Sequence, residues 1–177
     1  MNPGGFLKRV QCSADRLDDS LSGVIGSTFV MARTTDPHTA IAQLPSGQFL
    51  MAAAYDEIRA GTLVRSVQAC GHELPLLCVA VRTGHPIEPI IRDSRCFALS
   101  WLEESSKLVV RKFDREAEED LGDPFDAIAV ETLETESPVL CGSPLVFDCE
   151  VLRHFDLEAD HELYIGQVVA CRALLRT

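Results

Sequence analysis

The chain has 177 residues, 46% hydrophobic and 24% charged, which predicts a single globular domain over residues 1–177 with a full hydrophobic core. The formal net charge of −11 argues against a nucleic-acid partner, because a phosphate backbone calls for a basic surface. No stretch approaches the roughly 18 consecutive apolar residues of a membrane span, and the first residues lack the apolar core of a secretory signal. We therefore expect a cytoplasmic protein with no membrane partner.

The cysteines number seven, an odd count, and none of them forms a CxxC pair. This pattern predicts free thiols in a reducing compartment, with Cys78, Cys96 and Cys149 buried because they lie in apolar runs. The spacings of metal ligands are absent, so we predict no metal site.

The first third of the chain predicts a short helix, a strand and a hairpin. Residues 13–22 favour a helix with Leu17 and Leu21 on one face, and residues 28–34 favour a strand. Further along, Ser46 and Gly47 form a turn signal, which predicts a hairpin of residues 40–44 and 48–53.

Strands dominate the remainder. Residues 63–69 read as a strand, and the continuous apolar run 76–81 predicts a strand buried on both faces. A helix is expected over 88–94, with Pro89 in its first turn, and another over 105–115. Further strands are expected at residues 96–102, 125–131, 145–152 and 163–175.

Two of these strands alternate clearly between apolar and other residues. In the strand 96–102, Phe97, Leu99 and Trp101 share one face and are expected in the core. In the strand 145–152, Asp148 and Glu150 point away from the apolar face. Few strand pairs are separated by a long helix, so the pattern predicts a mainly β protein, an antiparallel barrel with a few short helices.

Three segments, taken in order and spacing, resemble the flavin reductase-like family. The first is GTLVRSVQACGHELPLLCVAVRTGHPIEPIIRDSRCFALSWL, the second is FDAIAVETLETESPVLCGSPLVFDCEV, and the third is DHELYIGQVVA. The resemblance implies an FMN-binding split β-barrel of Greek-key, antiparallel topology. It also implies a homodimer with FMN, or FAD as the alternative, held at the subunit interface.

The resemblance also assigns cofactor contacts. Ser66 lies on the strand that carries flavin-contacting hydroxyls in the family, while Arg82 and Thr83 lie in the loop where phosphate is held. A guanidinium can donate to two phosphate oxygens at once, and a threonine adds a hydroxyl. Ordinary solvated residues are the alternative. The full predicted cofactor set is Thr62, Arg65, Ser66, Gln68, Arg82, Thr83, His85 and Lys112.

His161 matches the histidine of the family's DH motif, where it would meet the nicotinamide or the flavin edge as the catalytic residue. The alternative is a histidine that only closes a turn. His154 and Asp160 are expected to be structural or exposed. Relatives carry small or hydroxyl residues where this chain has Arg65, Gln68 and Cys70, which puts activity in doubt more than fold.

The resemblance implies an NAD(P)H-dependent flavin reductase that passes a hydride from nicotinamide C4 to flavin N5, with NADH or NADPH as reductant. An oxygenase or another redox partner would receive the reduced flavin. Two alternatives stay open: a non-enzymatic flavin-binding or electron-transfer module of the same fold, and a degenerate split barrel without cofactor.

Overall fold

The computed structural model describes residues 37, 44, 46–71, 73–114 and 122–173. The chain divides into two units, Met1–Ala42 and Gln43–Thr177, and the fold below is that of the second. The helix predicted over 13–22 and the strand predicted over 28–34 lie outside the described residues. A single domain over residues 1–177 therefore stays a prediction.

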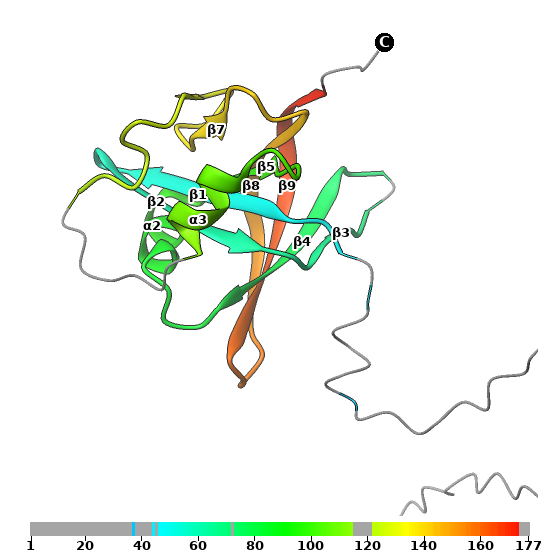
Figure 1. Ribbon diagram of the computed structural model, residues 1–177. Helices are drawn as coiled ribbons and strands as arrows, with labels where there is room; N and C mark the ends of the chain where they lie inside the picture. The colour runs from blue at the N-terminus through cyan, green and yellow to red at the C-terminus, as the bar shows by residue number, and fades with distance from the viewer. Residues whose placement is uncertain (1–36, 38–43, 45, 72, 115–121, 174–177) are drawn as a thin grey trace, which may run out of the picture. The chain divides into compact units, whose positions relative to one another are not determined.

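Seven antiparallel strands form the main sheet, in the order β2-β1-β5-β8-β9-β4-β3 (Figure 1). Its two edge strands, β2 and β3, follow each other in the chain, and β2 also contacts β4, so the sheet curls into an open barrel. The fold is thus mainly β and antiparallel, as predicted. The strands are β1 (Phe49–Tyr55), β2 (Ile58–Val64), β3 (Val67–Ala69), β4 (Leu76–Arg82), β5 (Cys96–Trp101), β8 (Leu145–Asp156) and β9 (His161–Ala173).

A second, small sheet pairs β6 (Val130–Glu131) with β7 (Val139–Leu140). Most of the strand predicted over 125–131 is therefore turn. The strand predicted over 63–69 is interrupted at Arg65 and Ser66, where the chain leaves β2 and begins β3.

Of the hairpin predicted around Ser46 and Gly47, the second strand, 48–53, is confirmed by β1, whereas the first strand, 40–44, lies outside the described residues apart from Leu44. The first hairpin of the described residues joins β1 to β2 through Asp56 and Glu57, which both take positive φ angles, 49° and 66°. Tight two-residue turns of this handedness favour Asn-Gly or Asp-Gly, and a glutamate in the second position hides the turn from the sequence pattern.

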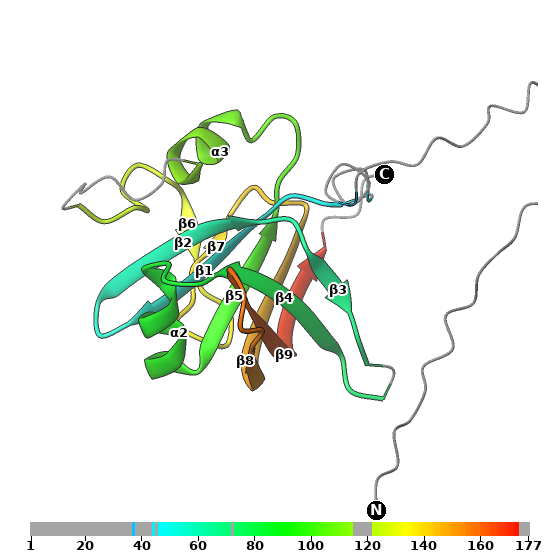
Figure 2. The same cartoon turned by 90° about the horizontal axis from the view of Figure 1, so that it is seen from below.

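The two described helices of more than one turn, α2 (Ile87–Ser94) and α3 (Lys107–Phe113), pack on opposite faces of β1. Met51 and Ala53 of β1 join the core under α2, whereas Leu50 and Ala52 join the core under α3, because successive strand residues point to opposite sides. In Figure 2, α3 accordingly lies well apart from α2. Both helices match their predictions closely.

The alternation rule fails at two residues. Trp101 is 42% exposed, although Phe97 and Leu99 of the same face are fully buried, because it is the last residue of β5 and extends past the core. Asp148 is fully buried, although it points away from Phe147 and Cys149. Its carboxylate accepts hydrogen bonds from the backbone N–H groups of Glu134 and Thr135, at 2.9 and 2.7 Å.

None of the helices in the described part of the chain is both long and apolar enough to cross a bilayer.

Candidate functional site

The strands β3, β4 and β9 lie side by side and have one face in the core and one face turned outward. Val79 and Tyr164, paired across β4 and β9, are 0% and 4% exposed. The residues on either side of Val79 and of Tyr164 point outward and are half-buried. They form pairs across the two strands, Cys78 with Ile165 and Ala80 with Leu163. We call this set the outward strip: Cys78, Ala80, Leu163 and Ile165.

The strip ends in polar groups at both sides. On β3, Gln68 lies directly opposite Cys78 and is exposed, and Ser66, two residues earlier, is also exposed. At the far end of β4, Arg82 pairs with His161, the first residue of β9. Four of the predicted residues thus border one continuous surface, although they are far apart in the sequence.

The turn before β9 orients His161. Its Nδ1 lies 3.1 Å from Asp160 Oδ1, and this hydrogen bond from His161 holds the pKa of the exposed Asp160 carboxyl below its usual value. Thr83 N–H donates to the Asp160 carbonyl at 2.9 Å, which ties the Arg82 loop to the same turn. Because Nδ1 faces Asp160, a ligand on the outward side would meet Nε2 of His161.

His85, predicted as a cofactor contact, makes its hydrogen bonds at the start of α2. Its Nδ1 accepts the Ile87 N–H at 3.1 Å, and its own N–H donates to Glu88 Oε1 at 3.3 Å. The ring therefore caps the start of α2 in its neutral form. Burial, and then the nearby Arg82 charge, lower the pKa of His85 and favour that neutral form.

The other predicted residues are scattered. Arg65 is exposed in the break between β2 and β3. Thr62 is half-buried on β2, on the same side as Ala60 and Val64, which belong to the core under α2 rather than to the outward strip.

Lys112 lies on α3, over a different part of the barrel. Its ammonium donates to the Asp126 carbonyl at 2.6 Å, and its side chain lines a cavity of about 530 Å³ together with Trp101, Leu108 and Ile128. Within this one chain the structure does not bring Lys112 to the outward strip.

The residues of the outward strip suit the predicted flavin. A half-buried apolar surface that includes the small side chains of Cys78 and Ala80 can stack an aromatic ring, and the Arg82 end offers a cation and a threonine hydroxyl to a phosphate. The hydroxyl donors expected on β3 are reduced to Ser66, with the Gln68 amide beside it.

Sequence reasoning missed one polar cluster and misjudged the thiols. Glu162 joins His154 and Tyr164 on the inward side of β8 and β9; alternating polar residues near the end of a strand were its only signal. Among the predicted buried thiols only Cys149 is buried, and burial, followed by the Asp148 charge, raises its pKa to about 12. Over the residues that the structure describes, no group of three His, Cys, Asp or Glu side chains could hold a metal.

Solved structures with the same fold include flavin reductases. The NADH:FAD oxidoreductase SgcE6 of Streptomyces globisporus C-1027 superposes with a TM-score of 0.71 at 19% identity, over 80% of this chain and 87% of that one. The styrene monooxygenase flavin reductase SMOB of Pseudomonas putida S12 gives a TM-score of 0.67 at 26% identity, over 78% and 86% of the two chains. These neighbours confirm the predicted split barrel.

Curated relatives include two flavoproteins of Synechocystis sp. Putative diflavin flavoprotein A 3 is 28% identical over 122 residues, or 69% of this chain, and diflavin flavoprotein A 1 is 25% identical over 134 residues, or 76%. The matched segment covers only 20% of the length of diflavin flavoprotein A 3 and 23% of that of A 1, so this chain spans about a fifth of either relative.

The model of the flavin reductase like domain matches residues 41–175, which includes all the strands of the barrel, the outward strip and the Arg82 loop. The predicted resemblance is therefore confirmed, and the chain belongs to the flavin reductase-like family.

Proposed function

We propose that this domain binds FMN on the outward strip and acts as an NAD(P)H-dependent flavin reductase. The observation that carries the proposal is the strand register, which lines up Gln68, Cys78 and Ile165 across the three strands and places Arg82 beside His161 at one end. The solved structures of the same fold include proteins named as flavin reductases, which supports the same activity.

Each part of the strip has a separate task in this proposal. The small side chains of Cys78 and Ala80 allow the flavin ring to approach the backbone of β4, while Leu163 and Ile165 exclude water beside it. Arg82 and Thr83 hold the phosphate through charge-assisted hydrogen bonds, and Gln68 and Ser66 donate to the ring edge or the ribityl chain.

The bound flavin would supply the redox chemistry, by accepting a hydride from the nicotinamide at its N5 atom. The protein orients the two rings, and His161 donates a hydrogen bond through Nε2 to the nicotinamide carboxamide or to the flavin edge. Asp160 keeps the His161 ring in that orientation, since it engages the other ring nitrogen.

We also propose a homodimer in the cytoplasm, in which a second copy covers the outward strip. Phe155 of β8 lies opposite Leu163 and is 49% exposed, so the apolar surface continues past the strip. Sedimentation at micromolar concentration should give twice the monomer mass; a monomer would count against a shared flavin site. An oxygenase or other redox partner would then take up the reduced flavin, in line with the styrene monooxygenase flavin reductase among the structural neighbours.

A direct experiment tests the activity. Purified protein is mixed with FMN and either NADH or NADPH, and the loss of reduced nicotinamide is followed by its absorbance. Turnover well above that of free FMN supports the proposal, whereas no turnover with either nucleotide removes it. FAD in place of FMN decides which flavin is preferred.

A second candidate is a flavin-binding electron-transfer module that does not oxidise NAD(P)H quickly. Exposed Gln68 and Cys70 stand where relatives carry small or hydroxyl residues, and this departure from the family pattern favours it. It predicts a yellow protein that retains FMN through gel filtration and shows no rapid turnover with either nucleotide.

A further inference from the structure

The end of the β8–β9 hairpin extends past most of the sheet, as Figure 1 shows for the orange strands. Strand β5 pairs with β8 only as far as Glu150, opposite Cys96, and residues 152–156 of β8 are all exposed. Beyond Glu150, β4 is the one described strand that still flanks the hairpin, and it pairs with β9 as far as His161. His161 therefore lies where the sheet is reduced to β8, β9 and β4.

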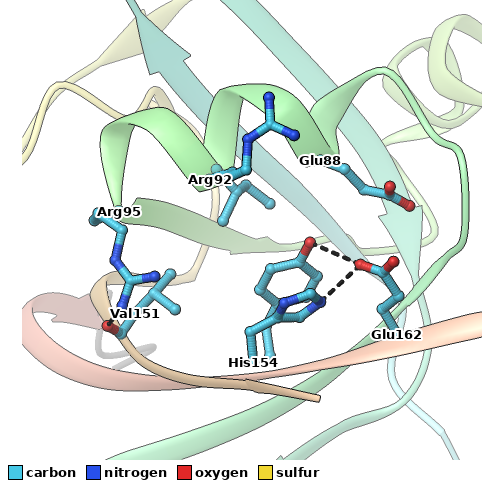
Figure 3. A pocket seen from close by; sticks show the side chains of 8 residues that line it. Glu88, Arg92, Arg95, Val151, His154 and Glu162 are labelled. Atoms are coloured by element: carbon cyan, nitrogen blue, oxygen red, sulfur yellow. Dashed lines mark hydrogen bonds and ion pairs between the residues drawn. The ribbon is translucent and has the colours of Figure 1, made fainter. Parts of the chain in front are cut away.

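A carboxylate on the inward side of this hairpin joins its two strands. Glu162 Oε2 lies 2.7 Å from His154 Nε2 of β8 and accepts the Tyr164 hydroxyl of β9 at 3.2 Å (Figure 3). The His154 and Tyr164 rings stack with centroids 4.5 Å apart and planes 20° apart. The Glu162 side chain is only 14% exposed, whereas the side chain of His154 is 39% exposed, so water reaches the cluster from the His154 side.

The same cluster contacts the rest of the protein through α2. Tyr164 is 4% exposed and belongs to the core that includes Ile87 and Ile91 of that helix. Burial, and then the charge of Glu162, raise the pKa of the Tyr164 phenol, so the hydroxyl stays protonated and keeps donating. Glu88 and Arg92 of α2 face the cluster across a cavity of about 140 Å³ (Figure 3).

Glu162 directly follows His161, and the two side chains point to opposite faces of β9 because strand residues alternate. A rotation of the Glu162 backbone would therefore turn His161 on the outward side. The other anchors described at this point are the Thr83–Asp160 backbone bond, the Asp160–His161 hydrogen bond, and the pairing of β9 with Arg82 of β4 and with Asp156 of β8.

We propose that Glu162 is a positioning residue: by binding His154 and Tyr164 it fixes the start of β9 and thereby the direction in which His161 faces the outward strip. The proposal rests on the proposed function, in which His161 contacts the nicotinamide or the flavin edge. It adds a residue that touches neither of them.

The test compares Glu162→Ala with Glu158→Ala, which removes an exposed carboxylate from the turn of the same hairpin. In the FMN-saturated protein, Glu162→Ala should lower kcat about tenfold, in keeping with the cost of misplacing a reacting group by a fraction of an ångström. The Kd for FMN should stay within about twofold, since Glu162 lies on the other side of β9 from the strip. Glu162→Gln retains an acceptor for Tyr164 and should recover part of kcat.

A readout without flavin separates this proposal from the proposed function. In the apo-protein, the ring resonances of His161 should shift in Glu162→Ala and keep their wild-type positions in Glu158→Ala. Tyr164→Phe, which removes one hydroxyl and keeps the ring stacked in the core, should give a smaller shift in the same direction.

An unchanged kcat and unchanged His161 resonances in Glu162→Ala would overturn the proposal. So would equal losses of kcat and FMN affinity that track a fall in melting temperature, because they would mean a purely structural role. If the wild-type protein neither binds FMN nor oxidises NAD(P)H, the proposed function fails, and the His161 resonances of the apo-protein still decide whether Glu162 positions that ring.

Discussion

Strands β4 and β9 present two faces, one inward and one outward, because successive residues of a strand point to opposite sides. Leu77, Val79 and Val81 of β4 are at most 8% exposed and pack in the core with Tyr164, whereas Cys78 and Ala80 are half-buried on the outward strip. The inward surface maintains the fold, and it tolerates little change because packed interiors leave no spare volume. The outward surface is half-buried and bordered by polar groups, which suits a ligand better than a packed core.

The largest expected effect separates the two surfaces by stability. Leu77→Ala should lower the free energy of unfolding by about 2–5 kcal/mol, the usual cost of removing a buried leucine side chain. Its neighbour Cys78→Ala should cost less than about 1 kcal/mol, because its thiol is only partly buried. Urea unfolding of both variants measures the difference. Equal losses would mean that the strip is part of the core.

The next prediction contrasts two of the three cations assigned to the cofactor, Arg82 and Lys112. Arg82→Ala should weaken FMN binding by about 10- to 100-fold, since a hydrogen bond to a charged group is worth roughly 1.5–3 kcal/mol. Lys112→Ala, on α3, should change the Kd by less than about threefold if one chain makes the whole site.

Fluorescence titration of FMN measures both constants, and Arg82→Lys should recover only part of the affinity because it lacks the planar fork. A large loss in Lys112→Ala would instead show that the α3 region reaches the phosphate, which in a homodimer a second copy could provide.

A smaller effect is expected on the pH dependence of stability, and it arises from His85 in the loop between β4 and α2. The pKa of His85 is lowered from 6.5 in the folded protein by burial and by Arg82. The unfolded chain therefore binds the extra proton first, and the stabilisation is complete above pH 6.5 and is lost as the pH falls below it. Because the neutral ring caps α2, the loss should approach about 1 kcal/mol, a typical value for a cap.

Unfolding free energies measured well above and well below pH 6.5 test this, with His85→Gln as the control that cannot titrate in this range. The difference between the two pH values should be smaller in His85→Gln than in the wild type. An equal difference in both proteins would assign the pH dependence to other groups.

The sequence pattern was sufficient where one physical rule decides the outcome. The apolar run 76–81 became β4, and the amphipathic segment at Ile91 became α2, because burial of apolar side chains dominates there. Residues that depend on distant parts of the chain were missed. Asp148 is buried only because the segment around Thr135 folds over it, and Trp101 is exposed because it lies beyond the core under α2, although its neighbour Leu102 is buried in the core under α3.

The site was predictable in part for the same reason. A family resemblance assigned Arg82 and His161, and the β4–β9 register then placed them side by side. It could not place Lys112, whose helix packs on the opposite face of β1 from α2, nor reveal that His85 caps a helix. The Glu162 cluster depends on a register shift in β8 between Val151 and Arg153, which no local pattern indicates.

The central claim is that the outward strip holds the flavin, and Ala80→Glu tests it most directly. Ala80 lies opposite Leu163 in the middle of the strip, so a glutamate there would block the ring and repel the phosphate. FMN fluorescence should be quenched saturably by the wild-type protein and remain unquenched with Ala80→Glu, while the circular dichroism of the two proteins is the same. Equal FMN affinity in both proteins, or no binding by the wild type, would contradict the account.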